Sequence, residues 1–117
     1  AAGDRAEIIR RAMAAIEEAG AVVPTVKDLA RSVDVTDRTL LRVFEENFGT
    51  SPRTYLALRR LHAVRRGLLR VDSPDTTVAD VLVRHGVWEF GRFAARYRRQ
   101  FGEAPSETLA RIGGGRA

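Results

Sequence analysis

Apolar residues recur every three or four positions along most of the chain, with charged residues between them. This spacing is typical of amphipathic helices, and we find no segment with the strict alternation of a β-strand. Residues 4–19 are the first such segment, which ends at Gly20, a residue favoured at helix C-termini. The pattern therefore predicts an all-α protein.

Capping residues divide the pattern into seven predicted helices. Serine and threonine are favoured just before a helix, and proline is favoured at its first position. With their caps included, the predicted helices span residues 4–19, 25–32, 36–49, 51–71, 77–84, 89–101 and 106–112. The predicted caps are Thr25, Thr36, Ser51, Thr77 and Ser106.

The chain contains an internal repeat with a period of 52–53 residues. Residues 25–29 match residues 77–81, and Val35 matches Val87. One residue is then inserted, after which Phe44, Phe48, Gly49 and Pro52 match Tyr97, Phe101, Gly102 and Pro105. Each unit has a short helix, a tight turn and a longer helix, which is the pattern of a helix-turn-helix motif. The alternative is a repeat that serves packing alone.

We therefore predict one DNA-binding domain, residues 1–117, with seven helices in two helix-turn-helix subdomains. The first subdomain is residues 5–50, a long linker helix is residues 51–71, and the second subdomain is residues 72–112. Residues 113–117, which contain three glycines, are predicted to be a disordered tail.

Composition limits the class of protein. A chain of 117 residues with 44% hydrophobic content can form one domain with a real core. It has no cysteine, which excludes disulfides and thiol chemistry, and no apolar run approaches the ~18–20 residues that span a bilayer. Charges near the N-terminus argue against a signal peptide. We expect a soluble, cytoplasmic protein with no membrane partner.

The net charge of +5 comes from the second half of the chain. Residues 1–58 have seven Arg, one Lys and nine acids, whereas residues 59–117 have twelve Arg and six acids. This asymmetry suggests a surface that faces a polyanion such as a nucleic acid. The alternative is a set of solvated arginines from an arginine-rich proteome.

Two groups of residues resemble the AraC/XylS family of transcription regulators over about residues 5–112. The first group is residues 30–35, 40–44, 48–52, 55–56 and 60–61. The second is Gly86, Phe93, Tyr97, residues 101–102 and residues 105–106. The resemblance implies a seven-helix module at bacterial promoters, in the nucleoid, whose two recognition helices enter successive major-groove segments of double-stranded DNA. It also implies activation through RNA polymerase subunits.

In the first unit, the positions that the family uses to contact bases fall on Arg38, Leu41 and Arg42. Arginine can bridge guanine O6 and N7, and leucine can pack on a thymine methyl group. The alternative for the two arginines is ion pairing with nearby carboxylates, those of Asp37, Glu45 and Glu46.

In the second unit, the corresponding family positions fall on Phe90, Gly91, Arg92 and Ala95. Since Gly91 and Ala95 cannot hydrogen-bond to a base edge, we expect Arg92 to be the main base reader, with Arg96 one turn further along. We expect phosphate contacts from Arg98 and Arg99. The second unit should recognise charge and shape more than sequence.

Helix N-termini offer unpaired N–H groups to phosphates. Ser51 with Arg53 is the best such candidate, and Thr25 and Thr77 are others, although all of these are also ordinary caps. Among the arginines along the linker helix, we expect Arg60 to bond within the domain. We expect the others, Arg59, Arg65 and Arg66, to be solvated.

Trp88 precedes the second recognition helix, at a position where the family more often has a small polar residue. It could lie against DNA or against a polymerase subunit. We favour the alternative in which Trp88 packs the start of the helix onto the core.

The residues predict a transcription regulator and not an enzyme. His62 and His85 are the only histidines and lack partners at ligand spacing, so we expect no metal and no cofactor. Because the chain starts without Met and has no evident effector pocket, we expect it to be the C-terminal part of a longer, ligand-responsive protein with an effector-binding and dimerisation domain. The alternative function is a helical module that contacts RNA polymerase without binding DNA.

Overall fold

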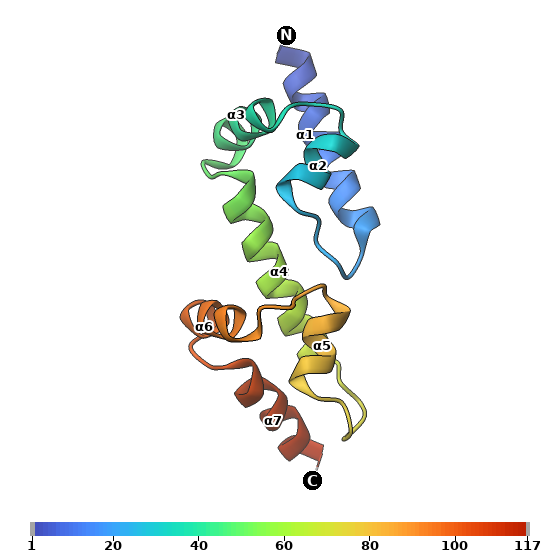
Figure 1. Ribbon diagram of the computed structural model, residues 1–117, viewed down its shortest axis with the longest axis vertical. Helices are drawn as coiled ribbons and strands as arrows, with labels where there is room; N and C mark the ends of the chain where they lie inside the picture. The colour runs from blue at the N-terminus through green and yellow to red at the C-terminus, as the bar shows by residue number, and fades with distance from the viewer. Residues whose placement is uncertain (1, 117) are drawn as a thin grey trace. The chain divides into compact units, whose positions relative to one another are not determined.

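All regular secondary structure in the part of the chain that the structure describes is helical (Figure 1). The computed structural model describes the backbone of residues 2–116 and the side chains of residues 4–112. Its helices are α1 (Ala2–Ala19), α2 (Val26–Ser32), α3 (Asp37–Phe48), α4 (Pro52–Leu69), α5 (Val78–Arg84), α6 (Phe90–Phe101) and α7 (Pro105–Arg116). The predicted all-α fold with seven helices is confirmed. No helix in this part is long and apolar enough to cross a membrane.

Side-chain caps set the starts of four helices as the sequence predicts. The hydroxyl oxygens of Thr25, Thr36, Ser51 and Thr77 each accept a backbone N–H three residues later, at 3.1 Å. Helices α3 and α6 end at Gly49 and Gly102, whose φ angles of 69° and 77° are in the left-handed region that glycine adopts without strain.

The ends of three helices differ from the prediction. Helix α1 begins at Ala2, two residues before the predicted start. Helix α4 ends at Leu69, before Val71, and α7 begins at Pro105, so Ser106 lies in its first turn and is not its cap. The N–H of Ala104 there donates to Glu107 Oε1 at 2.9 Å. The predicted disordered tail spans residues 113–117, and the structure gives the backbone of α7 as helical to Arg116. Ala117 lies outside the described residues.

The chain divides into two compact units, Ala1–Arg59 and Arg60–Ala117, and the boundary falls inside α4. In the first unit, α1 packs against α2 and α3. Its buried apolar residues are Ala12, Ile16, Val23, Leu29, Ala30, Val33, Leu40, Val43, Phe44 and Leu56. Arg59 is predicted to be solvated, but it interacts with two side chains of the first unit. It donates to Glu17 Oε1 at 3.1 Å and lies 6.0 Å from the centroid of the Tyr55 ring.

The second unit combines an apolar core with one buried polar network. The core consists of Leu61, Val64, Leu68, Val71, Val81, Leu82, Val87, Phe93 and Tyr97. The network joins α6 to α7, because the hydroxyl groups of Tyr97 and Thr108 are hydrogen-bonded at 2.9 Å. Thr108 also donates to Glu103 Oε2, and Arg111 donates to both carboxylate oxygens of Glu103 at 3.0 Å.

Arg65 belongs to this network, which contradicts the prediction that it is solvated. Its guanidinium donates to the Tyr97 hydroxyl at 3.3 Å and to Glu103 Oε2 at 3.4 Å. It also lies 4.8 Å from the centroid of the Phe101 ring, within the range of a cation–π interaction. Arg65 therefore stabilises the second unit.

Gly67 lies in α4, where its missing side chain leaves room for the ring of His85. A Cβ atom at residue 67 would lie 2.7 Å from His85 Cε1 and 3.2 Å from Val81 Cγ1. The ring cannot move away freely, since its Nδ1 is hydrogen-bonded to the Val81 carbonyl at 2.8 Å.

We predict that Gly67→Ala destabilises the protein by about 1–3 kcal/mol, as overpacking does, despite the higher helix propensity of alanine. Urea unfolding followed by circular dichroism measures this change. The matched control is Gly91→Ala in α6, where an added Cβ has no neighbour within 4 Å. The control should stabilise the protein by about 0.5–1 kcal/mol. Equal stability of Gly67→Ala and wild type would contradict the prediction.

The network also predicts a pH dependence of stability. The hydrogen bond from Thr108 lowers the pKa of Glu103, and the charges of Arg111 and Arg65 act in the same direction, whereas burial opposes them. Since the pKa is lower in the folded state, ionised Glu103 stabilises the fold above its unfolded-state pKa of about 4.3. This stabilisation is lost as the pH falls through the folded-state pKa.

We therefore expect the difference in unfolding free energy between wild type and Glu103→Gln to be constant near neutral pH and to shrink in acid. Urea unfolding over a pH series measures this difference. A difference that does not change with pH would show that the charge of Glu103 plays no part.

Candidate nucleic-acid interface

The turn between the two helices of each unit is closed by backbone hydrogen bonds. The N–H of Val35 donates to the Ala30 carbonyl at 3.0 Å, and the N–H of Val87 donates to the Leu82 carbonyl at 2.9 Å. The preceding residues, Asp34 and Gly86, have positive φ angles of 58° and 73°. In each unit, the helix that follows the turn has one side buried and the opposite side exposed. The buried residues are Leu40, Val43 and Phe44 in α3 and Phe93 and Tyr97 in α6.

The exposed side of α3 carries the three predicted base-contacting residues. Arg38 and Arg42 are one helical turn apart, and Leu41 is partly exposed beside them. Neither arginine forms an ion pair among the side chains that the structure describes. The alternative of pairing with neighbouring carboxylates is therefore not observed, and Glu46 instead pairs with Arg5 at 2.7 Å.

Helix α6 contains four arginines and no acidic residue. Arg92 is exposed and lies 3.3 Å from Glu89, which is also exposed, so this ion pair is weak and open to competition. Arg96 is exposed as well. Burial lowers the pKa of Arg60, and the positive charge of Arg96 lowers it further, to a lesser extent. Both residues belong to the second unit, which is rich in positive charge. Such a surface favours an anionic partner.

Arg98 and Arg99, predicted to contact phosphate, lie in the last turn of α6 and are exposed. Arg98 lies 3.6 Å from Glu107 of α7, whereas Arg99 has no ion pair within the described part of the chain. Positive side chains at a helix C-terminus also interact favourably with the helix dipole. Both arginines can therefore stabilise α6 as well as contact a phosphate.

The helix starts differ in how well they suit a phosphate. At α5, the Asp80 carboxylate accepts the Thr77 N–H at 2.9 Å, and this hydrogen bond lowers the pKa of Asp80. Asp28 likewise lies in the first turn of α2. A carboxylate at these helix starts competes with a phosphate, so the roles of Thr25 and Thr77 stay predictions.

The start of α4 has no such carboxylate. Ser51 Oγ accepts the Thr54 N–H at 3.1 Å, and the first turn of α4 has no acidic residue. Arg53 is exposed in that turn. This arrangement is more suitable for a phosphate than the starts of α2 and α5.

The prediction that Trp88 packs onto the core is wrong, because its side chain is 72% exposed. Val87 occupies the core position at the end of the turn and is only 5% exposed, so the next residue projects away from the core. The sequence contained a signal for this, since the repeat requires one inserted residue after Val87.

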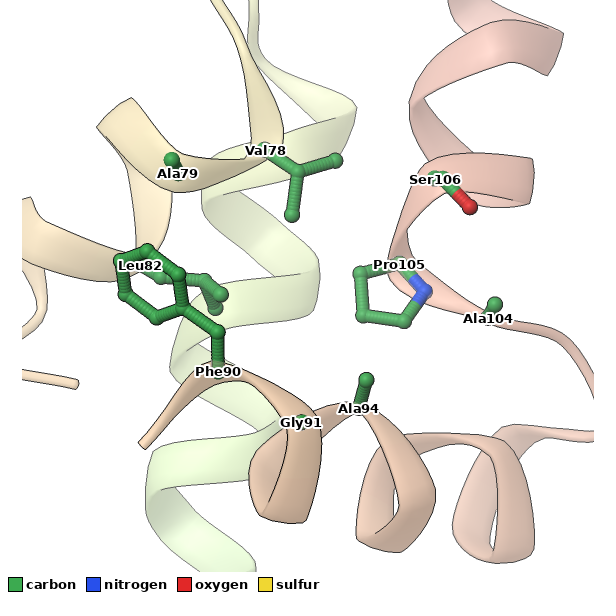
Figure 2. Close-up of a pocket in the computed structure, with 9 residues that line it drawn as sticks. All are labelled: Val78, Ala79, Leu82, Phe90, Gly91, Ala94, Ala104, Pro105 and Ser106. Atoms are coloured by element: carbon green, nitrogen blue, oxygen red, sulfur yellow. The ribbon is translucent and has the colours of Figure 1, made fainter. Parts of the chain in front are cut away.

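Phe90 and Gly91 line an apolar hollow of about 400 Å³ in the second unit (Figure 2). Its other lining residues come from α5 and from the start of α7: Val78, Ala79, Leu82, Ala104, Pro105 and Ser106, with Ala94 of α6. Phe90 therefore faces this hollow, although it matches a base-contacting position of the family. Among the described residues, no group of three or more histidine, aspartate or glutamate side chains could hold a metal ion.

The chain is similar in sequence and in fold to known helix-turn-helix proteins. A family described as helix-turn-helix domain matches residues 29–111. The crystal structure of a probable AraC family transcriptional regulator from Rhodopseudomonas palustris is 32% identical, with a TM-score of 0.74 over 91% of this chain and 97% of that one. An AraC-type DNA-binding domain protein from Chromobacterium violaceum is 25% identical, with a TM-score of 0.75 over 96% of both chains.

Two curated relatives are regulators of operons. The probable thc operon regulatory protein of Rhodococcus erythropolis is 35% identical over 105 residues, which are 90% of this chain and 32% of that protein. The XylDLEGF operon transcriptional activator 2 of Pseudomonas putida is 35% identical over 86 residues, which are 74% of this chain and 55% of that protein. The chain thus spans about a third to a half of the length of these relatives.

Proposed function

The chain belongs to the AraC family of helix-turn-helix transcription regulators, and on this basis we propose that α3 and α6 are its two recognition helices. It is a DNA-binding regulator. In the proposed complex, each helix enters one of two successive segments of the major groove of promoter DNA. We propose no catalytic role for any of its residues.

The observation that carries this proposal is the exposed side of α3. Arg38 and Arg42 have no ion pair among the described side chains, so hydrogen bonding to DNA requires no internal pair to be broken. Each guanidinium can bridge O6 and N7 of a guanine, and Leu41 can pack on a thymine methyl group. The first unit therefore supplies most of the base readers.

The second unit contributes charge and shape. Arg92 and Arg96 are its proposed base contacts, since Gly91 and Ala95 have no group that could hydrogen-bond to a base. Phosphate contacts come from residues of both units, and they position the protein without specifying a sequence. The proposed phosphate contacts are Thr25, Ser51, Arg53, Thr77, Arg98 and Arg99.

We base the proposed activity of the whole protein on the names and lengths of its relatives. Several of them are named as operon transcriptional activators, which supports activation at bacterial promoters through RNA polymerase subunits. We further propose that the protein works at the nucleoid, in the cytoplasm, where promoter DNA would be its partner. The greater length of the relatives supports a further domain that binds an effector or dimerises, and the full reading frame tests that part of the proposal.

We predict that Arg42→Ala relaxes base preference at one or two base pairs of the first half-site and costs about 1–3 kcal/mol of binding free energy. Arg92→Ala should relax different base pairs, those of the second half-site. Selection from a random-sequence duplex library, followed by sequencing, measures both effects. The control is Arg70→Ala, which removes one exposed positive charge outside both recognition helices and should leave the selected motif unchanged.

If the wild-type chain enriches no sequence and shifts no duplex in an electrophoretic assay, the chain does not bind DNA directly. That result would favour the alternative function, a helical module that contacts RNA polymerase.

Binding should also depend steeply on salt, because arginines that contact phosphates release condensed counterions. We expect the logarithm of the association constant to fall linearly with the logarithm of salt concentration, as measured by fluorescence anisotropy. Arg99→Ala should reduce the magnitude of that slope by about one without changing the selected motif. Binding that is insensitive to salt between low and physiological ionic strength is incompatible with this mechanism.

A further inference from the structure

The two units differ by one inserted residue, and the helix caps identify it as Trp88. The caps of the first helices, Thr25 and Thr77, are 52 residues apart. The caps of the recognition helices, Thr36 and Glu89, are 53 residues apart, as are their C-terminal glycines. In the first unit the N-cap directly follows Val35, whereas in the second unit Trp88 stands between Val87 and the N-cap.

The insertion places a large apolar side chain in solvent. Trp88 is the most exposed of the large hydrophobic residues on the described surface, at 72%. Among the described side chains it makes no hydrogen bond and no ring contact. The fold therefore does not account for a tryptophan at this position.

The surface beside Trp88 differs in a second way from its counterpart in the first unit. When α3 and α6 are aligned by their caps, Gly91 corresponds to Arg38, and Ala95 corresponds to Arg42. Small residues thus replace two long ones on the groove-facing side of α6. With less side-chain bulk in the way, the start of α6 can approach a DNA duplex more closely than the start of α3.

We propose that Trp88 contacts the DNA at the N-terminal end of α6, with its ring packed on deoxyribose and its indole N–H donated to a phosphate. The inference rests on the proposed function. A duplex is favoured as the partner because the N-terminal residues of a recognition helix are those that contact bases. The four arginines of α6 also favour a polyanion at this surface. Trp88 replaces the contact area that Gly91 and Ala95 lack.

The chain has only one tryptophan, so its own fluorescence reports on this contact. The probe is a duplex of about 30 base pairs, long enough for two successive major-groove sites, enriched by the wild-type chain from a random library. Excitation at the red edge of the indole band avoids the tyrosines. Binding should quench the Trp88 emission and reduce its accessibility to acrylamide.

Substitution separates this contact from the charge of the surface. Trp88→Ala should weaken binding to the same duplex by roughly 5- to 30-fold, as expected for loss of one large aromatic contact. Trp88→Phe should lose less. Neither variant should change the salt slope, because the indole is uncharged. The matched control is Leu69→Ala, which removes an exposed apolar side chain at the end of α4 and should bind like wild type.

Circular dichroism and urea unfolding check that both Trp88 variants fold. Suppose that anisotropy shows wild-type binding while the Trp88 emission is unchanged and Trp88→Ala binds equally well. The inference is then overturned and the proposed function stands. A change in emission that appears only when RNA polymerase is added also overturns it, in favour of a protein partner. Failure of the wild-type chain to bind any duplex is instead a failure of the proposed function.

Discussion

The burial of one aromatic residue in the middle of each recognition helix sets the orientation on which the rest of the structure depends. Phe44 in α3 and Tyr97 in α6 are fully buried. Because a helix turns once in 3.6 residues, fixing one side of it in the core also fixes which residues point away. Arg42 is exposed because Phe44, two residues later, is buried. The core of each unit therefore determines which residues can meet a partner.

The two units use this constraint for different purposes. The first unit carries exposed, unpaired arginines on a nearly neutral background. The second carries all of the net positive charge, with small residues at the positions that correspond to Arg38 and Arg42. Tyr97 also differs from Phe44 by a hydroxyl group, which is hydrogen-bonded to Thr108 and so holds α7 against α6. One repeated scaffold thus supports two surfaces of different charge and side-chain size.

Most of the fold could be predicted because its signals are local. Caps such as Thr36 and Gly49 act within one helical turn, and the apolar spacing identifies the buried sides. The features that could not be predicted depend on contacts between distant residues. The ion pair of Arg59 with Glu17 joins α4 to α1, and the bonds of Arg65 to Glu103 join α4 to the turn before α7. No sequence pattern marks such pairs. Among the candidate site residues, exposure followed from helical periodicity, whereas the exposure of Trp88 depended on how the inserted residue is accommodated.

The open space beside Gly91 has a consequence for how the sequence of such a regulator can evolve. A Cβ atom added there meets no neighbour within 4 Å and requires no unusual backbone angle. A small side chain can therefore be introduced on the proposed groove-facing side of α6 without disturbing the core beneath it. In the proposed complex with DNA, a single codon change at this position places a new group opposite the bases while the ability to fold is retained. In that complex, the second unit is the part of the molecule in which new regulatory targets can be acquired, by evolution or by design.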